Sequence, residues 1–427
     1  MPWGRSILLI ALIFLLLLTP GCSLEPGLSE GKVLPLSSDI IIVGDGIGGL
    51  TAALEAARKG AAVILFSEEP LDEHWMWEEG ALCPGDSGKP EPLEEILAAT
   101  GEGRGKKWHY KLLARNAATD LAWLSRETGL RMAREERFRC FPENLSYDQL
   151  HKRLKEKLLQ EGVRFIEGVV LEELLFNENG EAAGINFFDP AGVLNTAYAP
   201  AIILADGGYL NDPEQVKELA PDTAVASWRH SGRGTGIKLA RAAGLEIVDE
   251  ALFSYTLAVE KDQNWVPVEP PPGTLLIVDR QILLFSQYDE AELVKMLVNS
   301  ASGNGYLLVA GAGLRPEHEP EWPRYNSVAA FMESYKLQIP ELNRRFRNPQ
   351  ATFFGCPVKP VASYCLGGIA INESGLVLQK DQPVKGLYAL GETAGALNGA
   401  AIMPGAALTE ALVWGRHLGT VAARQIE

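Results

Sequence analysis

The sequence predicts an α/β fold: a domain built on a parallel sheet, interrupted along the chain by a second α/β segment. Three observations predict it. Residues 40–43 form an apolar run that leads into closely spaced glycines, a helix and another apolar run. A strand followed by glycines recurs at 201–208 and again at 386–392. From 213 to 349 the predicted elements are short and prolines cluster, which is typical of an inserted domain.

The segment 38–69 carries the strongest local signal. Its first apolar run is typical of a strand buried on both faces of a parallel sheet. Gly44, Gly46 and Gly49 follow in G-x-G-x-x-G spacing, which allows a tight turn, close approach of a pyrophosphate and close helix–strand packing. A helix over 50–59 and a strand over 62–66 complete a βαβ unit. The unit predicts a Rossmann-type dinucleotide site; a purely structural βαβ turn is the alternative.

The end of the second strand should carry an acid that binds the ribose hydroxyls. Ser67 stands at the first position to consider, and Glu68 follows it. Either the strand extends by one residue and Glu68 reaches the ribose, or Ser67 does so more weakly. As a third alternative, the glutamates at this point are solvated loop charges.

Composition disfavours several classes of function. The chain has 427 residues, long enough for two domains, and its 47% hydrophobic and 22% charged residues are typical of a globular protein. The formal net charge of −16 disfavours nucleic acid and anionic membrane surfaces as partners. None of the five cysteines lies in a C-x-x-C pair, so neither a haem attachment nor a zinc site is indicated.

Residues 1–22 resemble an export signal. Arg5 precedes an apolar run over 7–18, which is shorter than the roughly 20 residues that a membrane span needs. Thr19-Pro20-Gly21-Cys22 resembles a bacterial lipoprotein cleavage site that would make Cys22 the lipidated N-terminus, with an unusual proline. An uncleaved anchor and an ordinary signal peptide are the alternatives. We expect an exported lipoprotein on the extracytoplasmic side of a bacterial membrane, with 23–36 as a tether.

Periodicity and turn residues predict the remaining elements. Leucines at helical spacing predict a helix over 108–130, and Ser146 caps another that ends at Gly162. Strands are expected at 163–166 and 169–176, the second pairing with 182–188 in a hairpin. A strand over 201–205 runs into two glycines, a helix lies between Gly234 and Gly244, and a last helix begins near Pro404. The expected domains are 37–212 with 350–427, and 213–349 inserted between them.

Several motifs recur in the order that is typical of one family. Beyond the first glycine turn, these are Leu204-Ala205-Asp206-Gly207-Gly208, Gly234-Thr235-Gly236-Ile237, Leu366-Gly367-Gly368, Gly386-Leu387-Tyr388-Ala389-Leu390-Gly391-Glu392, Gly405-Ala406-Ala407-Leu408 and Trp414-Gly415-Arg416. On these motifs the chain resembles, over about residues 38–426, the flavoprotein family of fumarate reductase, succinate dehydrogenase and L-aspartate oxidase. The resemblance implies a Rossmann-type FAD-binding domain with an inserted α/β capping domain and FAD held without a covalent link. It also implies hydride transfer through flavin N5 to or from a carbon–carbon bond.

The resemblance further implies which residues contact FAD. Glu392 holds the ribityl chain, with a charge at a helix start as its alternative role. The amides near Ala407 and Leu408 face the N1/O2 edge of the flavin, where reduction places negative charge. The expected FAD contacts are Gly44, Gly46, Ile47, Gly48, Gly49, Ser67, Glu68, Gly80, Ala81, Val170, Ala205, Asp206, Gly207, Gly391, Glu392, Gly405, Ala407 and Leu408.

The substrate side departs from the family's pattern. The family's reductases hold a dicarboxylate with two histidines and arginine clamps, and an arginine delivers the proton. Tyr364 stands at one histidine position, Thr256 falls near the other, and Ile402 replaces a clamping arginine. Arg280 is the nearest candidate for the proton-donating arginine. Because an apolar side chain cannot replace a bidentate arginine, a C4-dicarboxylate substrate is disfavoured.

Other polar residues complete the candidate site. Tyr364 is a candidate proton donor or hydrogen-bond anchor, as tyrosines are in the related ketosteroid dehydrogenases, with a packed aromatic as the alternative. Arg229, His230 and Arg233 lead into the helix after Gly234 and are candidates to bind an anionic group, or form a solvated basic loop. His74 stands at about the spacing of a histidine that carries covalent flavin in some members, but its flanking residues do not match.

Two classes of function remain open. One is an exported FAD oxidoreductase that acts on a CH–CH bond of a substrate less anionic than fumarate. The other is a flavin-binding protein that serves electron transfer or interaction without small-molecule turnover. The sequence has no haem or iron–sulfur motif, so we expect another protein or a quinol to exchange electrons with the flavin.

Overall fold

A computed structural model describes most of the chain after residue 34. The described residues are 35–68, 74–85, 88–219, 232–261, 264–268, 270–288, 290–312, 314, 320–347 and 351–426. Within these ranges, no helix combines the length and the apolar character that crossing a membrane requires. The expected export signal lies outside the described residues and stays a prediction.

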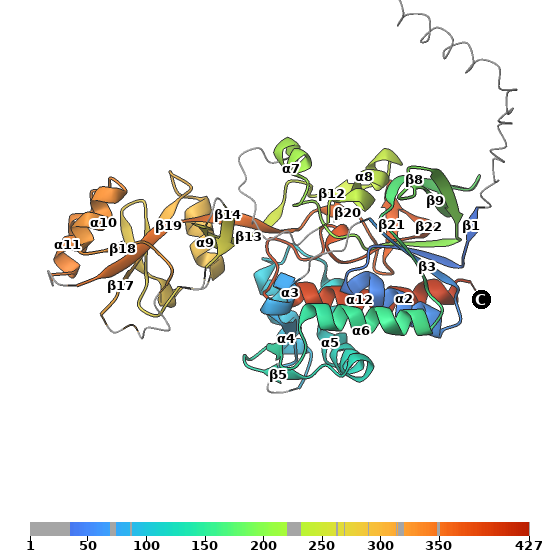
Figure 1. Ribbon diagram of the computed structural model, residues 1–427, viewed down its shortest axis with the longest axis horizontal. Coiled ribbons are helices and arrows are strands. Elements are labelled where there is room, and N and C mark those ends of the chain that lie inside the picture. Colours follow the sequence, from blue (N-terminus) through green and yellow to red (C-terminus); the bar gives the residue numbers. More distant parts are fainter. Residues whose placement is uncertain are drawn as a thin grey trace, which may run out of the picture. The chain divides into compact units, whose positions relative to one another are not determined.

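A six-stranded sheet forms the centre of the first domain (Figure 1). Its order is β21 (Leu376–Gln379), β22 (Gln382–Ala389), β11 (Ala201–Leu204), β2 (Ile40–Val43), β3 (Val63–Ser67) and β7 (Arg164–Glu167). All neighbours are parallel except β21, which is antiparallel to β22. Every residue of β2, β3 and β11 is buried, as the unbroken apolar runs predict. Segments on either side of the inserted region therefore build one sheet.

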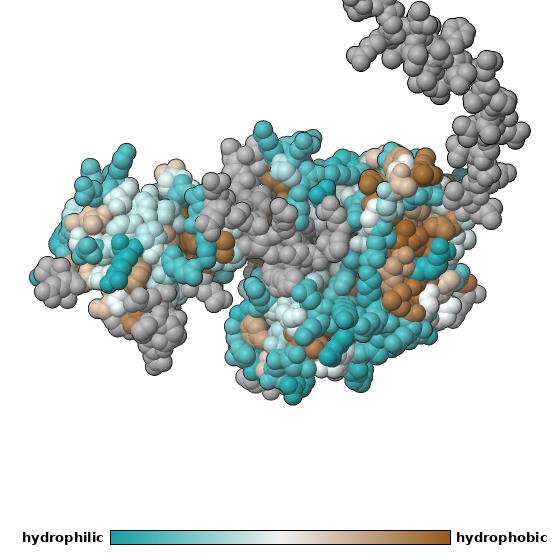
Figure 2. Space-filling model, viewed as in Figure 1, coloured by the Kyte–Doolittle hydropathy of each residue, from teal (hydrophilic) through white to brown (hydrophobic). Residues whose placement is uncertain are grey.

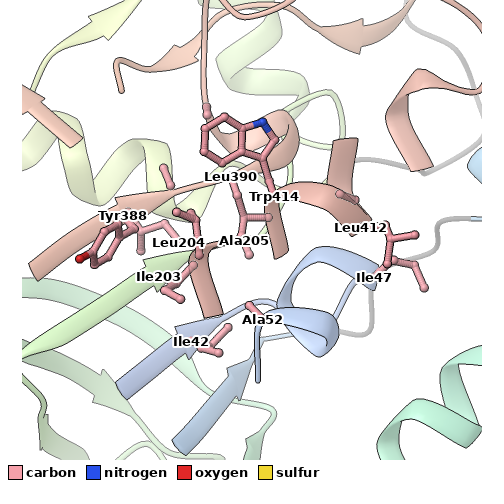
Figure 3. Close-up of a cluster of buried hydrophobic side chains, with 14 of the residues drawn as sticks. Ile42, Ile47, Ala52, Ile203, Leu204, Ala205, Tyr388, Leu390, Leu412 and Trp414 are labelled. Atoms are coloured by element: carbon pink, nitrogen blue, oxygen red, sulfur yellow. The ribbon is translucent and has the colours of Figure 1, made fainter. Parts of the chain in front are cut away.

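Two helices from opposite parts of the sequence pack together beside this sheet. They are α2 (Ile47–Arg58) and α12 (Ala406–Arg424), which lie side by side in Figure 1. Gly415 makes this possible, because a Cβ there would lie 2.1 Å from the Thr51 hydroxyl and 2.5 Å from the Gly48 carbonyl oxygen. Figure 3 shows apolar side chains of both helices and of the strands meeting in one cluster, among them Ile42, Ile203 and Leu412.

Further helices and two small sheets complete the first domain. α6 (Tyr147–Gln160) begins with the predicted cap, because the Ser146 side chain and Gln149 form a reciprocal capping box. The other helices are α3 (His74–Glu79), α4 (Glu91–Thr100) and α5 (Lys107–Thr128). One small sheet is β4 (Ala81–Leu82), β6 (Arg139–Pro142) and β5 (Met132–Arg134). The other is β1 (Leu36–Ser37), β10 (Leu194–Tyr198), β9 (Ala182–Phe188) and β8 (Val170–Phe176), which contains the predicted hairpin.

A seven-stranded sheet organises the inserted domain. It contains β13 (Phe253–Lys261), β14 (Asn264–Pro267), β15 (Leu275–Val278), β16 (Gln281–Leu284), β17 (Gly305–Ala310), β18 (Arg324–Tyr325) and β19 (Phe353–Cys365). The short 3-10 helix η1 (Phe285–Gln287) follows β16, and α9 (Glu290–Val298), α10 (Val328–Ser334) and α11 (Pro340–Arg345) accompany the sheet. The sheet thus runs from residue 253 to 365.

The segment before this sheet contacts the first domain. α7 (Pro213–Leu219) is followed by α8 (Thr235–Ala242), whose first residues bond to Glu68 and Asp206. β12 (Ile247–Val248) then pairs with β20 (Gly368–Ile369), after which β22 leads into the short 3-10 helix η3 (Gly391–Thr393). The domain limits at 213 and 349 remain a prediction, but this part of the chain packs on the dinucleotide-binding side.

The surface carries some exposed apolar residues on the sheet of β8 and β10. Val170, Leu194 and Tyr198 are each about half exposed. Figure 2 shows hydrophobic residues at the surface in the region that Figure 1 labels β8 and β9. Within the described ranges these side chains stay exposed, and scattered exposed apolar residues are normal on a folded protein.

Candidate flavin site

The glycine turn between β2 and α2 packs against the end of β11. Gly44 has φ +105°, and a Cβ there would lie 2.3 Å from the Ala205 carbonyl oxygen. A Cβ on Gly49 would lie 2.0 Å from the Gly44 oxygen, and one on Gly48 would lie 2.5 Å from the Leu390 side chain. Only glycine lets the turn, the helix and the later strands approach this closely.

The N-terminus of α2 suits an anionic group. Gly46 is its N-cap, no side chain caps the helix, and no acidic residue lies in its first turn. The positive end of the helix dipole and the backbone N–H groups of the first turn favour a phosphate at such a position. Gly46, Ile47 and Gly48 therefore occupy the place where the pyrophosphate of a dinucleotide would bind.

Glu68, and not Ser67, stands beyond the end of β3. Ser67 is the last strand residue and is buried. Glu68 is half-buried; its Oε1 accepts from the Leu171 N–H at 3.0 Å and its Oε2 from the Thr235 hydroxyl at 2.5 Å. Val170, at the start of β8, is exposed and directly precedes Leu171, whose N–H donates to this carboxylate. This arrangement favours Glu68 as the ribose ligand. Its hydrogen bonds also distinguish Glu68 from a charge that points into solvent from a loop.

We expect Glu68→Gln to lower FAD affinity by about 10- to 100-fold, since a hydrogen bond to a charged group is worth roughly 1.5–3 kcal/mol. Ser67→Ala is the matched control, and it should bind FAD as the parent protein does. Fluorescence titration of the flavin-free protein with FAD measures both. Equal affinities for the parent and Glu68→Gln would remove Glu68 from the ribose site.

Asp206 joins the end of β11 to the start of α8. Its Oδ2 accepts from the Gly236 N–H at 2.7 Å, while its buried Oδ1 has no hydrogen-bond partner among the described residues. Burial raises the pKa of Asp206 to about 7, and the nearby Glu68 carboxylate also raises it. Gly207, with φ +81°, follows at once and donates its N–H to the Thr393 hydroxyl at 3.0 Å. The turn after β11 is thereby tied to the turn after β22.

Glu392 lies at the centre of these turns. Its Oε1 accepts from the Cys365 N–H at 2.6 Å, and a Cβ on Gly208 would lie 2.6 Å from the same oxygen. Burial raises the pKa of Glu392 to about 7. Gly391, before it, has φ +61° and faces open space, because an added Cβ would meet nothing within 4 Å. The late Gly-Glu segment also meets the early glycine turn, because a Cβ on Gly48 would lie 2.5 Å from the side chain of Leu390, two residues before Glu392.

The N-terminus of α12 faces the segment of Gly80 and Ala81. Gly405 is its left-handed N-cap with φ +81°, and its N–H donates to Glu79 Oε2 at 3.2 Å. On the next turn, the Thr409 hydroxyl accepts from the Leu82 N–H at 2.7 Å. Burial raises the pKa of Glu79 to about 7. Ala407 and Leu408 lie in the first turn of α12, where a helix stabilises negative charge.

Tyr364 lies buried near the end of β19, between two acids of this site. Its hydroxyl hydrogen-bonds to Glu410 of α12, and burial together with the charges of Glu410 and Glu392 raises its pKa well above the usual value. In the sheet, Tyr364 pairs with Ser254 of β13, whose hydroxyl accepts from the Ile402 N–H at 3.4 Å. Tyr364 therefore links the end of β19 to the helix that faces the expected flavin edge.

The residues present fit FAD. The N-termini of α2 and α12 both lack a side-chain cap and an acidic first turn, so each can accept an anionic group. Asp206 keeps an unpartnered buried oxygen, and the backbone at Gly391 borders open space. Glu68 adds an acid at the end of the second strand, where a ribose would lie.

Comparison with known proteins decides the family. The family model described as "FAD binding domain" matches residues 39–282 and 294–408. The chain belongs to this family. FAD is therefore its cofactor, and the expected Rossmann-type FAD-binding domain with a capping domain is confirmed.

Individual members of the FAD-binding family are only distantly similar. NADH:fumarate oxidoreductase of Klebsiella pneumoniae (strain 342) is 22% identical over a match that covers 92% of this chain and 48% of the relative, so the chain spans about half its length. Vinyl phenol reductase of Lactiplantibacillus plantarum is 24% identical, with 91% of this chain and 97% of the relative covered. The structure of 3-ketosteroid delta1-dehydrogenase from Sterolibacterium denitrificans matches with TM-score 0.75 at 14% identity, covering 91% of this chain and all of that one (100%). The expected likeness to fumarate reductase flavoproteins is confirmed.

The other candidates for catalysis and substrate binding in this FAD-binding protein are scattered. Thr256 lies on β13, and its hydroxyl donates to Glu290 of α9 at 2.6 Å. Arg280 occupies the exposed turn between β15 and β16 with φ +69° and lines a hollow with other residues of the inserted domain, none of which is Tyr364. Arg233 is exposed ahead of α8, while Arg229 and His230 lie outside the described residues.

Three polar residues near the candidate site were not anticipated from the sequence. They are Glu79, His109 and Glu410, all buried or nearly so. Glu79 directly precedes the anticipated Gly80. Glu410 stands in an otherwise apolar stretch of α12, and a charged residue in such a stretch signals a site. His109 belongs to the amphipathic helix α5 and carries no comparable signal in the sequence.

Proposed function

We propose that this chain is an FAD-dependent oxidoreductase that adds or removes hydrogen across a carbon–carbon bond of a substrate without two carboxylates. The observation that carries the proposal is the charge around Tyr364. Among the described residues, the ionisable groups that act on its hydroxyl are the acids Glu410 and Glu392 and the Cys365 thiol. Within the part of the chain that the structure describes, neither acid has a lysine or arginine among the groups that shift its pKa.

A dicarboxylate is a poor ligand for such surroundings. A buried carboxylate needs a cation or several strong hydrogen-bond donors to offset the loss of water. Ile402, at the position where the family's reductases carry an arginine, has an apolar side chain, and its backbone N–H is already bonded to Ser254. Two similar proteins are named for a vinyl phenol and a ketosteroid, which supports a substrate of low negative charge.

The roles of the residues follow from their positions. When bound, FAD supplies hydride transfer to or from carbon. Glu68 and the N-terminus of α2 hold the nucleotide end, while Glu392 and the first turn of α12 hold the flavin end. The Tyr364 hydroxyl gives or takes the proton at the neighbouring carbon. The buried strands around Tyr364 exclude water from this exchange.

An anaerobic reoxidation assay tests the proposal. The FAD-loaded protein is reduced chemically and mixed with cyclohexenone, methyl cinnamate, a vinylphenol or fumarate, and the return of oxidised-flavin absorbance is timed. We expect at least one neutral acceptor to react faster than fumarate, and Tyr364→Phe to slow that reaction by about 100-fold or more while leaving FAD bound. Reoxidation by dyes and oxygen alone would instead indicate an electron-transfer flavoprotein.

A further inference from the structure

Five side chains form a buried polar cluster behind the proposed proton donor. They come from β19, α12, α5 and the loop before α12, and each is less than 9% exposed. The members are Tyr364, Glu410, Trp414, His109 and Asn398. A buried cluster of this kind is costly unless every group is satisfied, so we ask what the cluster could do besides packing.

The bonds of the cluster have a fixed direction. The Trp414 indole N–H can only donate, and it donates to His109 Nδ1 at 3.1 Å. Burial lowers the pKa of His109 to about 4, so its ring is neutral at pH 7 and its proton resides on Nε2. That nitrogen lies 3.3 Å from Asn398 Oδ1 and 3.6 Å from Glu410 Oε2. Asn398 in turn donates to Glu410 Oε2 at 2.8 Å. The donors from Trp414 onward therefore point toward Glu410.

No lysine or arginine of the described residues is among the groups that act on Glu410 as it receives these bonds. Its Oε2 accepts the bond from Asn398, while its buried Oε1 has no hydrogen-bond partner among the described residues. The titratable groups that act on it are His109 and Tyr110 from α5, Tyr364 from β19 and Glu392 after β22. Burial raises the pKa of Glu410 to about 7, with the bonds from Asn398 and Tyr364 opposing the rise. The carboxyl group can therefore hold a proton near neutral pH.

The loop that carries Asn398 also borders solvent. Ala396 and Gly399, on either side of the Leu397–Asn398 pair, line an open cleft of about 550 Å³ together with Arg104, Asp249 and Leu252. Ala396 has φ +58°, an uncommon conformation for a residue with a Cβ. The Asn398 backbone carbonyl is held by the Tyr110 hydroxyl at 2.8 Å. Asn398, which bonds to Glu410, thus belongs to a loop whose neighbouring residues line an open cleft.

We propose that Glu410 is a positioning and proton-supplying residue for Tyr364, which returns a proton to the Tyr364 oxygen after that oxygen has protonated the substrate. This inference rests on the proposed function. In the reducing direction, the Tyr364 O–H bond breaks as the substrate C–H bond forms. The Glu410 O–H bond then breaks as the Tyr364 O–H bond forms again. Glu410 is left as a carboxylate that accepts from Asn398 and Tyr364, and water in the cleft supplies its next proton.

Glu410→Gln is the central variant, because glutamine keeps the shape and the hydrogen bonds but cannot release a proton. With the neutral acceptor that reoxidises the parent protein fastest, we expect kcat to fall about 10-fold or more at neutral pH and KM to stay within about 3-fold. The break in the pH profile of kcat near pH 7 should disappear. The double variant with Tyr364→Phe should be no slower than Tyr364→Phe alone, because the two residues act in sequence. Glu410→Asp should restore part of the pH break.

A measurement without turnover separates this inference from the proposed function. Glu79, Asp206 and Glu392 also have pKa values raised to about 7, so the informative signal is the infrared difference between the FAD-loaded parent and Glu410→Gln. That difference should contain one C=O stretch of a protonated carboxylic acid that titrates near pH 7 and is missing from Glu410→Gln. A carboxylate ionised throughout pH 5–8, or an unchanged kcat and pH profile in Glu410→Gln, would overturn the inference alone. An absence of reaction between the parent and every acceptor would overturn the proposed function as well.

Discussion

Gly44→Ala is expected to unfold the site and to give protein without visible flavin absorbance. The backbone there has φ +105°, and the new Cβ would lie 2.3 Å from the Ala205 oxygen and 2.6 Å from its carbon. Both atoms belong to the backbone at the end of β11, so no side chain can rotate to make room. Backbone strain and overpacking each cost about 1–3 kcal/mol, and together they should lower the free energy of unfolding by at least about 3 kcal/mol.

Gly60→Ala is the matched control for that substitution. Gly60 ends the helix of the same βαβ unit with φ +90°, but an added Cβ meets nothing within 4 Å. It should therefore suffer only the strain, about 1 kcal/mol, and retain FAD. Urea unfolding and the flavin absorbance of the purified proteins distinguish the two. If both variants lost equal stability, the close approach of β11 to the glycine turn would be wrong.

Gly415→Val is expected to have the second-largest effect, by forcing α12 away from α2. The added Cβ would lie 2.1 Å from the Thr51 hydroxyl and 2.5 Å from the Gly48 carbonyl oxygen. Overpacking of this kind costs about 1–3 kcal/mol or more, and here it also displaces the start of α2, where the pyrophosphate is expected to bind. We expect a lower melting temperature and weaker FAD binding in the same variant.

A second substitution tests the cause. Thr51→Ala removes the nearer of the two obstacles but leaves the Gly48 carbonyl, so Gly415→Val combined with Thr51→Ala should recover only part of the lost stability. Thr51→Ala alone removes bonds to the Ile47 and Gly48 carbonyls, and it serves as the reference for the double variant. Full additivity of the two changes would show that the side chains do not meet.

Much of the first domain could be predicted from the sequence because its signals are local. The apolar runs at β2, β3 and β11 fit strands that are buried on both faces, and Ser146 caps α6 through Gln149, three residues later. The end of β3 at Ser67 needed the structure, while the choice of Ser67 or Glu68 as the ribose ligand stays a prediction. Each correct prediction relied on residues that are neighbours along the chain.

The rest of the candidate site depends on contacts between distant residues. His109 contacts Trp414, which lies 305 positions later in the chain. Tyr364, on a strand, contacts Glu410, on a helix, and no periodic pattern in the sequence relates these two elements. Arg280, the nearest candidate for the proton-donating arginine, illustrates the same limit: its place along the chain does not show which part of the fold its turn faces, and the structure exposes that turn on the inserted domain. The sequence shows the charge and the type of each residue, but it does not show which distant residue becomes its partner in the fold.

The interleaving of the two halves of the sheet has a consequence for biosynthesis. β2 and α2 leave the ribosome first, whereas β22 and α12, which close the same cofactor site, follow only after the whole inserted domain has been made. During the synthesis of the more than 300 residues from Arg58 to Gln382, the glycine turn and the apolar face of α2 have no contacts with β22 and α12. Flavin loading is therefore a late event, and a stop codon within the last helix would leave a chain that has every phosphate-binding glycine and still cannot retain its cofactor.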